Sequence, residues 1–257
     1  MRLKQHDVRP PGEVRVIGLS DLPELEEGDD LGQLLADACA RVGGLEPGDV
    51  VVVAQKAVSE VEGRIVHLAD VVPSSRAVEL AGAEGDPRQV EVILQESVEI
   101  VRSRPPLVIA RTRHGFVCAS AGVDASNAKG PDTVILLPLD PDASAAALRT
   151  RLTELTEVAP GVIVSDSFGR AWRQGTTDVA LGAAGITALR DLRGTCDTRG
   201  YELSSTMIAL ADEIAGAAEL VMGKASGVPA AIVRGVDAAG DGRASDLVMP
   251  QDRDLFR

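Results

Sequence analysis

Apolar residues occur along this chain in two patterns, as short unbroken runs and as longer segments with helical spacing. The short runs are rich in Val and Ile and are bounded by polar or turn-forming residues, as buried strands usually are. They are VRVIGL (14–19), GDVVVVAQK (48–56), LVIAR (107–111), VILLP (134–138), GVIVSDS (161–167) and AAIVRG (230–235). Each of these runs predicts one strand.

The longer segments repeat their apolar residues at the spacing of amphipathic helices. They are GDDLGQLLADACARV (28–42), DPRQVEVILQESVEIV (86–101), DPDASAAALRTRLTELT (140–156) and LSSTMIALADEIAGAAELVM (203–222). Asp86 and Pro87 are typical of a helix start, and Gly223 can end the last helix. The stripe through Met207 and Ile214 is expected to pack in the core. Alternating strands and helices predict a mixed body of one or two closely packed domains.

The composition allows a large core and limits the ligands to be expected. Of the 257 residues, 45% are hydrophobic but only 2% are aromatic, so Val, Ile, Leu and Ala must form that core. The formal net charge of −13 argues against partners such as nucleic acid or an anionic membrane, because phosphate contacts need clustered Lys and Arg. An anionic ligand would therefore need positive charge concentrated at its site.

The cysteines and the apolar runs indicate a cytoplasmic protein. Cys39, Cys118 and Cys196 are widely spaced and form no CxxC pair, which is typical of reduced thiols. No apolar run is long enough for a signal peptide or a membrane span. We therefore expect a cytoplasmic protein with no membrane contact.

A first polar cluster, VCASAGVDASN (117–127), follows a predicted strand. Its Asp124 could supply a carboxylate oxygen to Mg²⁺ or Mn²⁺, which prefer oxygen ligands and leave positions open for phosphate. Asp, Ser and Asn in a Gly-containing turn also cap helices and close turns. From the residues alone, both interpretations stay open.

A second cluster, VIVSDSFGRAWRQG (162–175), is more specific. Asp166 and Ser167 end an apolar strand and offer a carboxylate and a hydroxyl to a metal ion. Arg170 and Arg173 follow, and their guanidinium groups suit phosphate or carboxylate anions. The alternative is that Asp166 caps a turn and that Arg173 is an ordinary surface residue.

A third cluster, VMGKASGVPA (221–230), places Lys224 in a glycine-flanked turn that could bind phosphate through its backbone N–H groups. It is not a Walker P-loop. The chain also has no GxGxxG, GxSxG or HExxH motif, and its three histidines, His6, His67 and His114, are isolated. Dinucleotide, serine-hydrolase and zinc-protease chemistries are therefore not indicated.

Seven segments together resemble the F420-0:γ-glutamyl ligase family in order and spacing. They are LPELEEGDDL (22–31), AQKAVSEVEGR (54–64), AGVDASN (121–127), LLPLDPD (136–142), SDSFGRAWRQG (165–175), DEIA (212–215) and MGKASGVPAAIVRG (222–235). The resemblance implies an α+β fold with a mixed sheet and two closely packed lobes, which is neither a Rossmann nor a P-loop fold. It also implies one ligase domain over residues 1–257, without the flavin reductase domain of some relatives, and a homodimer.

The same resemblance implies a reaction and its site. The family joins L-glutamate to a deazaflavin cofactor precursor, F420-0, through an acyl phosphate formed with GTP, and it uses Mn²⁺ or Mg²⁺ with K⁺ as a further cation. Metal binding falls on Asp124, Asp166 and Ser167, and Arg170 and Arg173 are the candidate catalytic residues. Nucleotide contacts fall on Leu22, Pro23, Glu24, Leu25, Gln55, Lys56, Glu60, Asn127, Met222, Gly223 and Lys224.

One position departs from the family pattern. Glu60 stands where the resemblance predicts a nucleotide-binding Lys, and a negative charge there opposes a triphosphate. Lys56 can replace the missing charge if both side chains share one face, as they would in a regular strand. Two alternatives therefore remain, a related amide ligase for another phosphorylated carboxylic acid and an inactive paralogue that binds nucleotide or cofactor.

Overall fold

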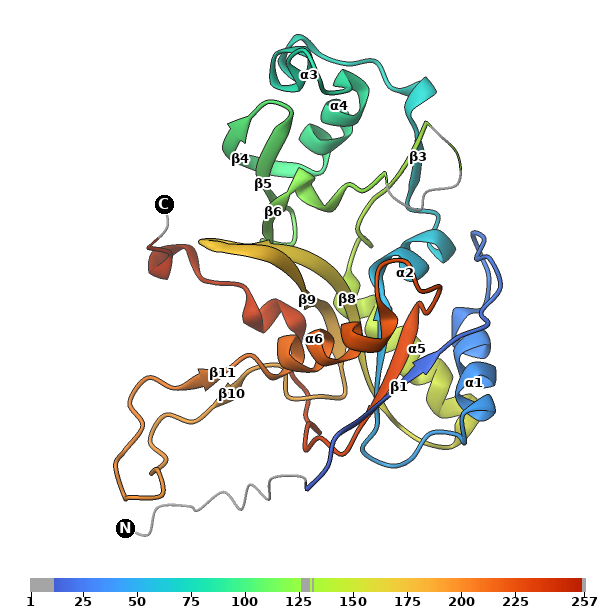
Figure 1. The fold of residues 1–257 in the computed structure, drawn as a ribbon, viewed down its shortest axis with the longest axis vertical. Coiled ribbons are helices and arrows are strands. Elements are labelled where there is room, and N and C mark those ends of the chain that lie inside the picture. The colour runs from blue at the N-terminus through green and yellow to red at the C-terminus, as the bar shows by residue number, and fades with distance from the viewer. Residues whose placement is uncertain (1–11, 126–129, 131, 256–257) are drawn as a thin grey trace.

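The computed structural model describes residues 12–125, 130 and 132–255, and it shows two lobes (Figure 1). The larger lobe contains a mixed sheet with helices on both faces. The smaller lobe, coloured cyan to green in Figure 1, is inserted between α2 and α5. The fold is α+β with a mixed sheet and two lobes, as predicted.

The helices begin and end as follows. They are α1 (Leu31–Arg41), α2 (Gln55–Val61), α3 (Ser75–Ala81), α4 (Pro87–Gln95), α5 (Pro141–Thr156) and α6 (Leu210–Met222). Short 3₁₀ helices lie at Leu68–Asp70, Ser120–Gly122, Ala244–Leu247 and Gln251–Arg253. In the described part of the chain, no helix is long and apolar enough to cross a membrane.

The strands form one large sheet and three small ones. They are β1 (Arg15–Leu19), β2 (Val50–Ala54), β3 (Ile65–His67), β4 (Ser97–Arg104), β5 (Leu107–Thr112), β6 (Val117–Ala119), β7 (Thr133–Ile135), β8 (Gly161–Arg170), β9 (Arg173–Ala184), β10 (Arg190–Asp191), β11 (Met207–Ile208) and β12 (Ala230–Arg234). The large sheet has the order β1-β12-β2-β8-β9, and the small sheets are β3-β7, β4-β5-β6 and β10-β11.

The large sheet is the middle layer of the larger lobe. Its β2 and β8 run parallel, whereas its other neighbouring strands are antiparallel. Helices α1 and α5 pack on one face through residues such as Leu35 and Leu152, and α6 packs on the other through Ile214. The unbroken Val run of β2 is buried because both faces of its sheet are covered.

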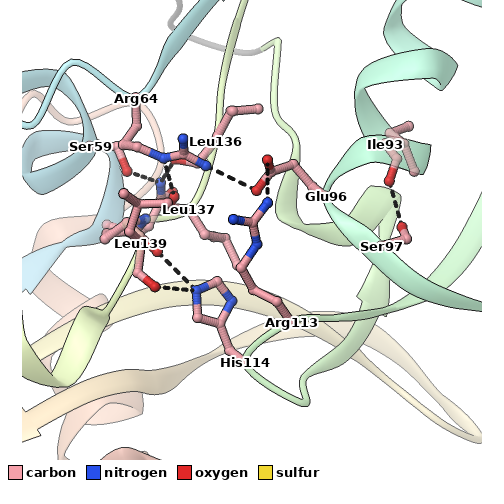
Figure 2. Close-up of polar contacts among 12 residues, drawn as sticks. Ser59, Arg64, Ile93, Glu96, Ser97, Arg113, His114, Leu136, Leu137 and Leu139 are labelled. Carbon is pink, nitrogen blue, oxygen red and sulfur yellow. Dashed lines mark hydrogen bonds and ion pairs between the residues drawn. The ribbon is translucent and has the colours of Figure 1, made fainter.

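The smaller lobe has a hydrophobic core of its own. Helices α3 and α4 pack against the β4-β5-β6 sheet, with Leu80, Ile93 and Val108 buried between them. The two lobes meet at a polar junction in which Arg64 and Arg113 both donate to the carboxylate of Glu96, at 2.9 Å each (Figure 2). This junction joins the chain after α2 to both α4 and the β5–β6 turn.

The prediction that the strand over residues 48–56 includes Gln55 and Lys56 was wrong. Strand β2 ends at Ala54, and α2 begins at Gln55. The Gln55 amide donates to Ser59 Oγ, one helical turn later, at 2.6 Å, and to the Leu136 carbonyl at 2.9 Å. These bonds hold the buried Gln55 side chain at the start of the helix.

Two predicted helices are shorter than expected. The segment 86–101 divides into α4 and the strand β4, because its alternating residues after Glu96 pair with β5. The segment 203–222 becomes helical only at Leu210, and Met207 belongs to β11. In both segments strand pairing overrides the helical periodicity of the sequence.

The predicted helix at 140–156 is confirmed as α5. Strand β9, in contrast, was not predicted at all. The sequence of β9, RQGTTDVALGAA, has so many polar and small residues that its pattern does not predict a strand. It forms one because it pairs along the whole of β8, which runs beyond the predicted 161–167 to Arg170. This long hairpin extends from the sheet toward β6 (Figure 1).

Candidate active site

Two parallel strands of the large sheet bring the predicted site residues to one place. In the register of β2 and β8, Ala54, the last residue of β2, lies opposite Ser165 in the middle of β8. Gln55 and Lys56 follow β2 directly, and Asp166 continues β8 at the same level. The ends of neighbouring parallel strands are a common position for ligand sites.

A cavity of about 400 Å³ opens at the end of β2. Twelve residues predicted to bind metal or nucleotide line it: Leu22, Pro23, Glu24, Leu25, Gln55, Lys56, Glu60, Asp166, Ser167, Met222, Gly223 and Lys224. They come from four separate segments, namely the chain before α1, helix α2, the middle of β8 and the end of α6. We call this space the first cavity.

Helix α2 places Lys56 and Glu60 one turn apart on the same face. Lys56 Nζ lies 2.6 Å from Asp124 Oδ2, and both side chains are largely shielded from solvent. This ion pair brings Asp124, which belongs to the smaller lobe, to the edge of the first cavity although it does not line the cavity itself. Lys56 and Glu60 therefore share one face because they lie one turn apart in a helix, and not because they lie in a regular strand.

Asp166 is the most perturbed acid in the first cavity. Burial raises its pKa to about 6, and the nearby carboxylates of Asp178 and Asp124 add to this rise. The backbone N–H of Ser167 and the ammonium group of Lys56 act in the opposite direction. A cation beside Asp166 would favour its ionised form, so the side chain suits a metal ligand.

Asp178, on β9, orients the hydroxyl groups of the site. Ser165 Oγ donates to Asp178 Oδ2 at 2.9 Å, and Ser167 Oγ donates to Asp178 Oδ1 at 2.8 Å. Because each hydroxyl hydrogen points toward the carboxylate, the oxygen lone pairs face other directions. Ser167 can therefore offer an oxygen ligand whose orientation is fixed by a buried acid.

Negative charge predominates in the first cavity. Its lining contains the carboxylates of Glu24, Glu60, Asp166, Asp178 and Glu219, against the ammonium groups of Lys56 and Lys224. Burial also raises the pKa of Glu219, and the Asp178 charge contributes to that rise. A polyphosphate would be repelled here unless cations accompanied it.

The donor set is compatible with a hard divalent cation. Asp124, Asp166 and Ser167 offer only oxygen atoms, which Mg²⁺ and Mn²⁺ prefer. Within residues 12–125, 130 and 132–255, no three His, Cys, Asp or Glu side chains form a ready-made ion site. A cation held by these residues would therefore need further ligands from phosphate or water.

The structure does not bring the predicted arginines into the site. Arg170 and Arg173 lie at the exposed turn of the β8–β9 hairpin, and neither lines the first cavity. Arg170 Nη2 donates to the Gln174 carbonyl at 3.4 Å. Their catalytic role stays a prediction. Asn127, a predicted nucleotide contact, lies outside the described residues.

Sequence reasoning missed Ser165, Asp178 and Glu219. Asp178 lies directly before the apolar part of β9 and is itself buried, and a buried acid usually has a specific role. Glu219 lies in the last turn of α6, where the helix dipole disfavours an acid. Both positions carried a local signal, but it became meaningful only once β9 and α6 were placed beside β8.

Comparison with known proteins gives matches over most of the chain. The family model described as F420-0:Gamma-glutamyl ligase matches residues 20–235. A Methanocaldococcus jannaschii protein, coenzyme F420:L-glutamate ligase, is 41% identical and aligns with 97% of this chain and 99% of its own. Proteins of the same name from Methanopyrus kandleri and Archaeoglobus fulgidus are 46% and 41% identical, with 91% and 95% of this chain and 94% and 96% of their own covered.

These alignments span almost the whole chain, including the four segments that build the first cavity. Identities above 40% over such lengths leave no doubt about common ancestry with these proteins. The chain therefore belongs to the F420-0:Gamma-glutamyl ligase family.

Proposed function

We propose that this protein adds L-glutamate to coenzyme F420-0, using GTP to activate the acceptor carboxylate. The observation that carries this proposal is the first cavity, in which Lys56, Asp166 and Ser167 meet the Gly223–Lys224 turn. The names of the similar proteins support the substrate and the bond formed. The nucleotide, the cations and the intermediate are parts of the proposal.

Asp124, Asp166 and Ser167 would hold the divalent cations, and K⁺ is a further expected cation. When bound, Mn²⁺ or Mg²⁺ would neutralise phosphate charge in a cavity whose own side chains are mostly acidic. Asp178 would keep the Ser167 hydroxyl in its binding orientation. Lys56 would hold Asp124 at the cavity edge by their ion pair.

The proposed reaction has two steps. In the first, an oxygen of the acceptor carboxylate attacks the γ-phosphorus of GTP, the bond to the bridging oxygen breaks, and GDP leaves. In the second, the amine of L-glutamate attacks the acyl carbon, phosphate leaves, and the amine nitrogen gives a proton to water. The chain contributes mainly by positioning the reactants and by electrostatic stabilisation, through Lys56 and the Lys224 turn.

Mass spectrometry tests the proposal directly. Purified protein is incubated with F420-0, L-glutamate, GTP and Mn²⁺, and the expected product carries one or more additional glutamyl units. Omission of GTP should abolish the product, and GDP and phosphate should appear in proportion to the amide bonds formed. Unchanged F420-0 in the complete mixture would contradict the proposed ligase.

A second candidate function, nucleotide binding without catalysis, is favoured by one observation. Glu60 lines the first cavity, where the family resemblance predicts a Lys. Calorimetry with GTP and Mn²⁺, together with the product assay, separates the candidates, because both bind the nucleotide and only a ligase releases GDP and phosphate with F420-0 and L-glutamate. Light scattering during gel filtration would test the homodimer, which we also propose from family membership.

A further inference from the structure

A second cavity, of about 790 Å³, lies away from the first. Four separate parts of the chain line it: the turn after β5, the N-terminal half of α5, the end of β9 and the loop 240–245. It shares no lining residue with the first cavity. It is also large enough for a ligand of cofactor size.

The second cavity offers charges that the fold itself does not neutralise. Arg149 and Arg243 line it, and neither guanidinium forms an ion pair with any residue in the described part of the chain. Arg149 is held in place by a 3.0 Å bond from its Nε to the Pro160 carbonyl. Two guanidinium groups facing one cavity suit an anion such as a phosphodiester.

Three acids line this cavity; Asp241 is exposed to solvent, and the other two accept hydrogen bonds from the backbone. Asp142 accepts from the N–H groups of Ala183 and Ala244 at 2.8 Å each, and Asp140 accepts from Ala143 N at 3.0 Å. Both carboxylates lie at the N-terminus of α5, where the helix dipole stabilises them. Their free lone pairs can still accept from the hydroxyl groups of a ligand.

Two aromatic rings form part of the wall of the second cavity. His114 and Phe116 line it and stack on each other, with ring centroids 5.6 Å apart. His114 is fixed by contacts of its Nε2 with the Pro138 and Leu139 carbonyls at 3.0 and 3.1 Å, as Figure 2 shows for Leu139. These rings give the cavity a flat apolar surface beside its charged one.

Phe116 also lies edge-to-face against Phe168, with centroids 6.2 Å apart. Phe168 is two residues beyond Asp166 on β8 and therefore on the same face of the strand, about 7 Å away. One pair of rings thus separates the second cavity from the buried acid of the first. An elongated ligand in the second cavity can reach Asp166 with a short flexible arm.

We propose that the second cavity binds the body of the acceptor, a planar heteroaromatic ring with a polyhydroxyl chain and a phosphodiester. The first cavity, at about 400 Å³, has room for one nucleotide-sized ligand but not for a second molecule of that size. The carboxylate end of the acceptor passes Phe116 and Phe168 and meets the nucleotide beside Asp166. This inference rests on the proposed function and assigns its acceptor subsite to Arg149 and Arg243.

Two variants test the subsite. Arg243→Glu reverses one unpaired charge of the cavity, and Ala146→Trp fills the cavity from the exposed side of α5. The matched control is Arg102→Glu, which makes the same charge change at an exposed position of β4 outside both cavities. Binding of F420-0 is followed by its own fluorescence without nucleotide, and binding of GTP with Mn²⁺ by calorimetry.

Both cavity variants should weaken F420-0 binding by about tenfold or more, Arg243→Glu because a charged hydrogen bond is lost and Ala146→Trp because the indole occupies the space of the ligand. GTP affinity should stay close to that of the wild type, and the control should behave like the wild type with both ligands. Unchanged F420-0 affinity in both variants, or an equal loss of GTP affinity, would overturn the subsite. If the wild type binds F420-0 but forms no glutamyl product, the proposed function fails while the variants still decide the subsite. A wild type that binds no F420-0 contradicts both.

Discussion

At the scale of single residues, Asp166 combines a functional position with a cost to stability. Its buried carboxyl has a pKa of about 6 in the folded protein, well above that of an exposed Asp. The folded state therefore holds the proton more tightly than the unfolded state, and stability falls as the pH rises from about 4 to about 6. Above that range the cost stays constant, because the carboxyl is ionised in both states.

Asp166→Asn should separate these two roles. Without metal and with EDTA at pH 7.5, the variant should be more stable than the wild type by roughly 1–2 kcal/mol, because it removes a buried charge. Its glutamylation rate should fall roughly 100-fold or more, because one proposed metal ligand is lost. Urea unfolding from pH 4 to pH 8 measures the stability, and the difference should grow up to about pH 6. A variant with near-normal activity would exclude Asp166 as a metal ligand.

The three cysteines differ in how accessible their thiols are to solvent. Burial raises the pKa of Cys39 to about 11 and that of Cys118 to about 12, whereas Cys196 is exposed. At pH 8 the two buried thiols are almost entirely protonated and shielded, so they should not react with iodoacetamide. Mass spectrometry of the native protein should show one modification, at Cys196, and denatured protein should show three. Rapid modification of Cys118 in the native protein would contradict the burial of its side chain in β6.

At the scale of elements, the β8–β9 hairpin depends on close packing under α5. A Cβ added to Gly182 would overlap the carbonyl oxygen of Pro141 and lie 2.9 Å from Asp142 N, whereas a Cβ at Gly169 meets no atom within 4 Å. Gly182→Ala should therefore destabilise the protein by about 3 kcal/mol, because the backbone of α5 must move. Gly169→Ala, in the same hairpin, should change stability by less than about 0.5 kcal/mol. Thermal unfolding compares the two, and equal melting temperatures would show that α5 does not pack as described.

The elements also show which parts of the site a sequence can reveal. The apolar run before Asp166 and Ser167 predicted a strand that carries these polar residues, but not its end, because pairing with β9 extends β8 to Arg170. The helix α2 was missed because AVSEV follows a strand without a break, and only the tertiary bonds of Gln55 reveal where the helix begins. Asp178 needed the pairing of β8 with β9, which a local pattern does not contain. The second cavity is even harder to predict from the sequence, because four segments that lie far apart along the chain form it.

At the scale of the whole molecule, the second cavity and the edge of the first depend on how the two lobes are joined. Asp124 comes from the smaller lobe and pairs with Lys56 of the larger one. His114, from the turn between β5 and β6, contacts the chain that leads into α5. Between these contacts, Glu96 binds Arg64 and Arg113 with only 12% of its side chain exposed (Figure 2). The junction thus fixes the lobes where acceptor and nucleotide are proposed to meet.

Glu96→Gln should loosen this junction; Glu96 itself lines neither cavity, although its partner Arg113 lines the second. Removing the shared charge leaves two guanidinium groups without their carboxylate, which should cost about 1–3 kcal/mol. The matched control is Glu79→Gln, whose ion pair with Arg76 is exposed and should contribute less than about 0.5 kcal/mol. Amide hydrogen exchange in Glu96→Gln should rise at both sides of the junction, near Arg64 and near Arg113, while the sheet core keeps its protection.

The kcat of Glu96→Gln shows whether the junction positions the two substrates or only stabilises the fold. If the lobes hold the two substrates in register, kcat should fall about tenfold while the affinity for GTP changes little, because small misplacements of reacting groups are costly. Glu79→Gln should retain wild-type turnover. An unaltered kcat together with faster exchange would mean that the lobes can move apart without disturbing the reaction, and that the acceptor reaches Asp166 through contacts within one lobe.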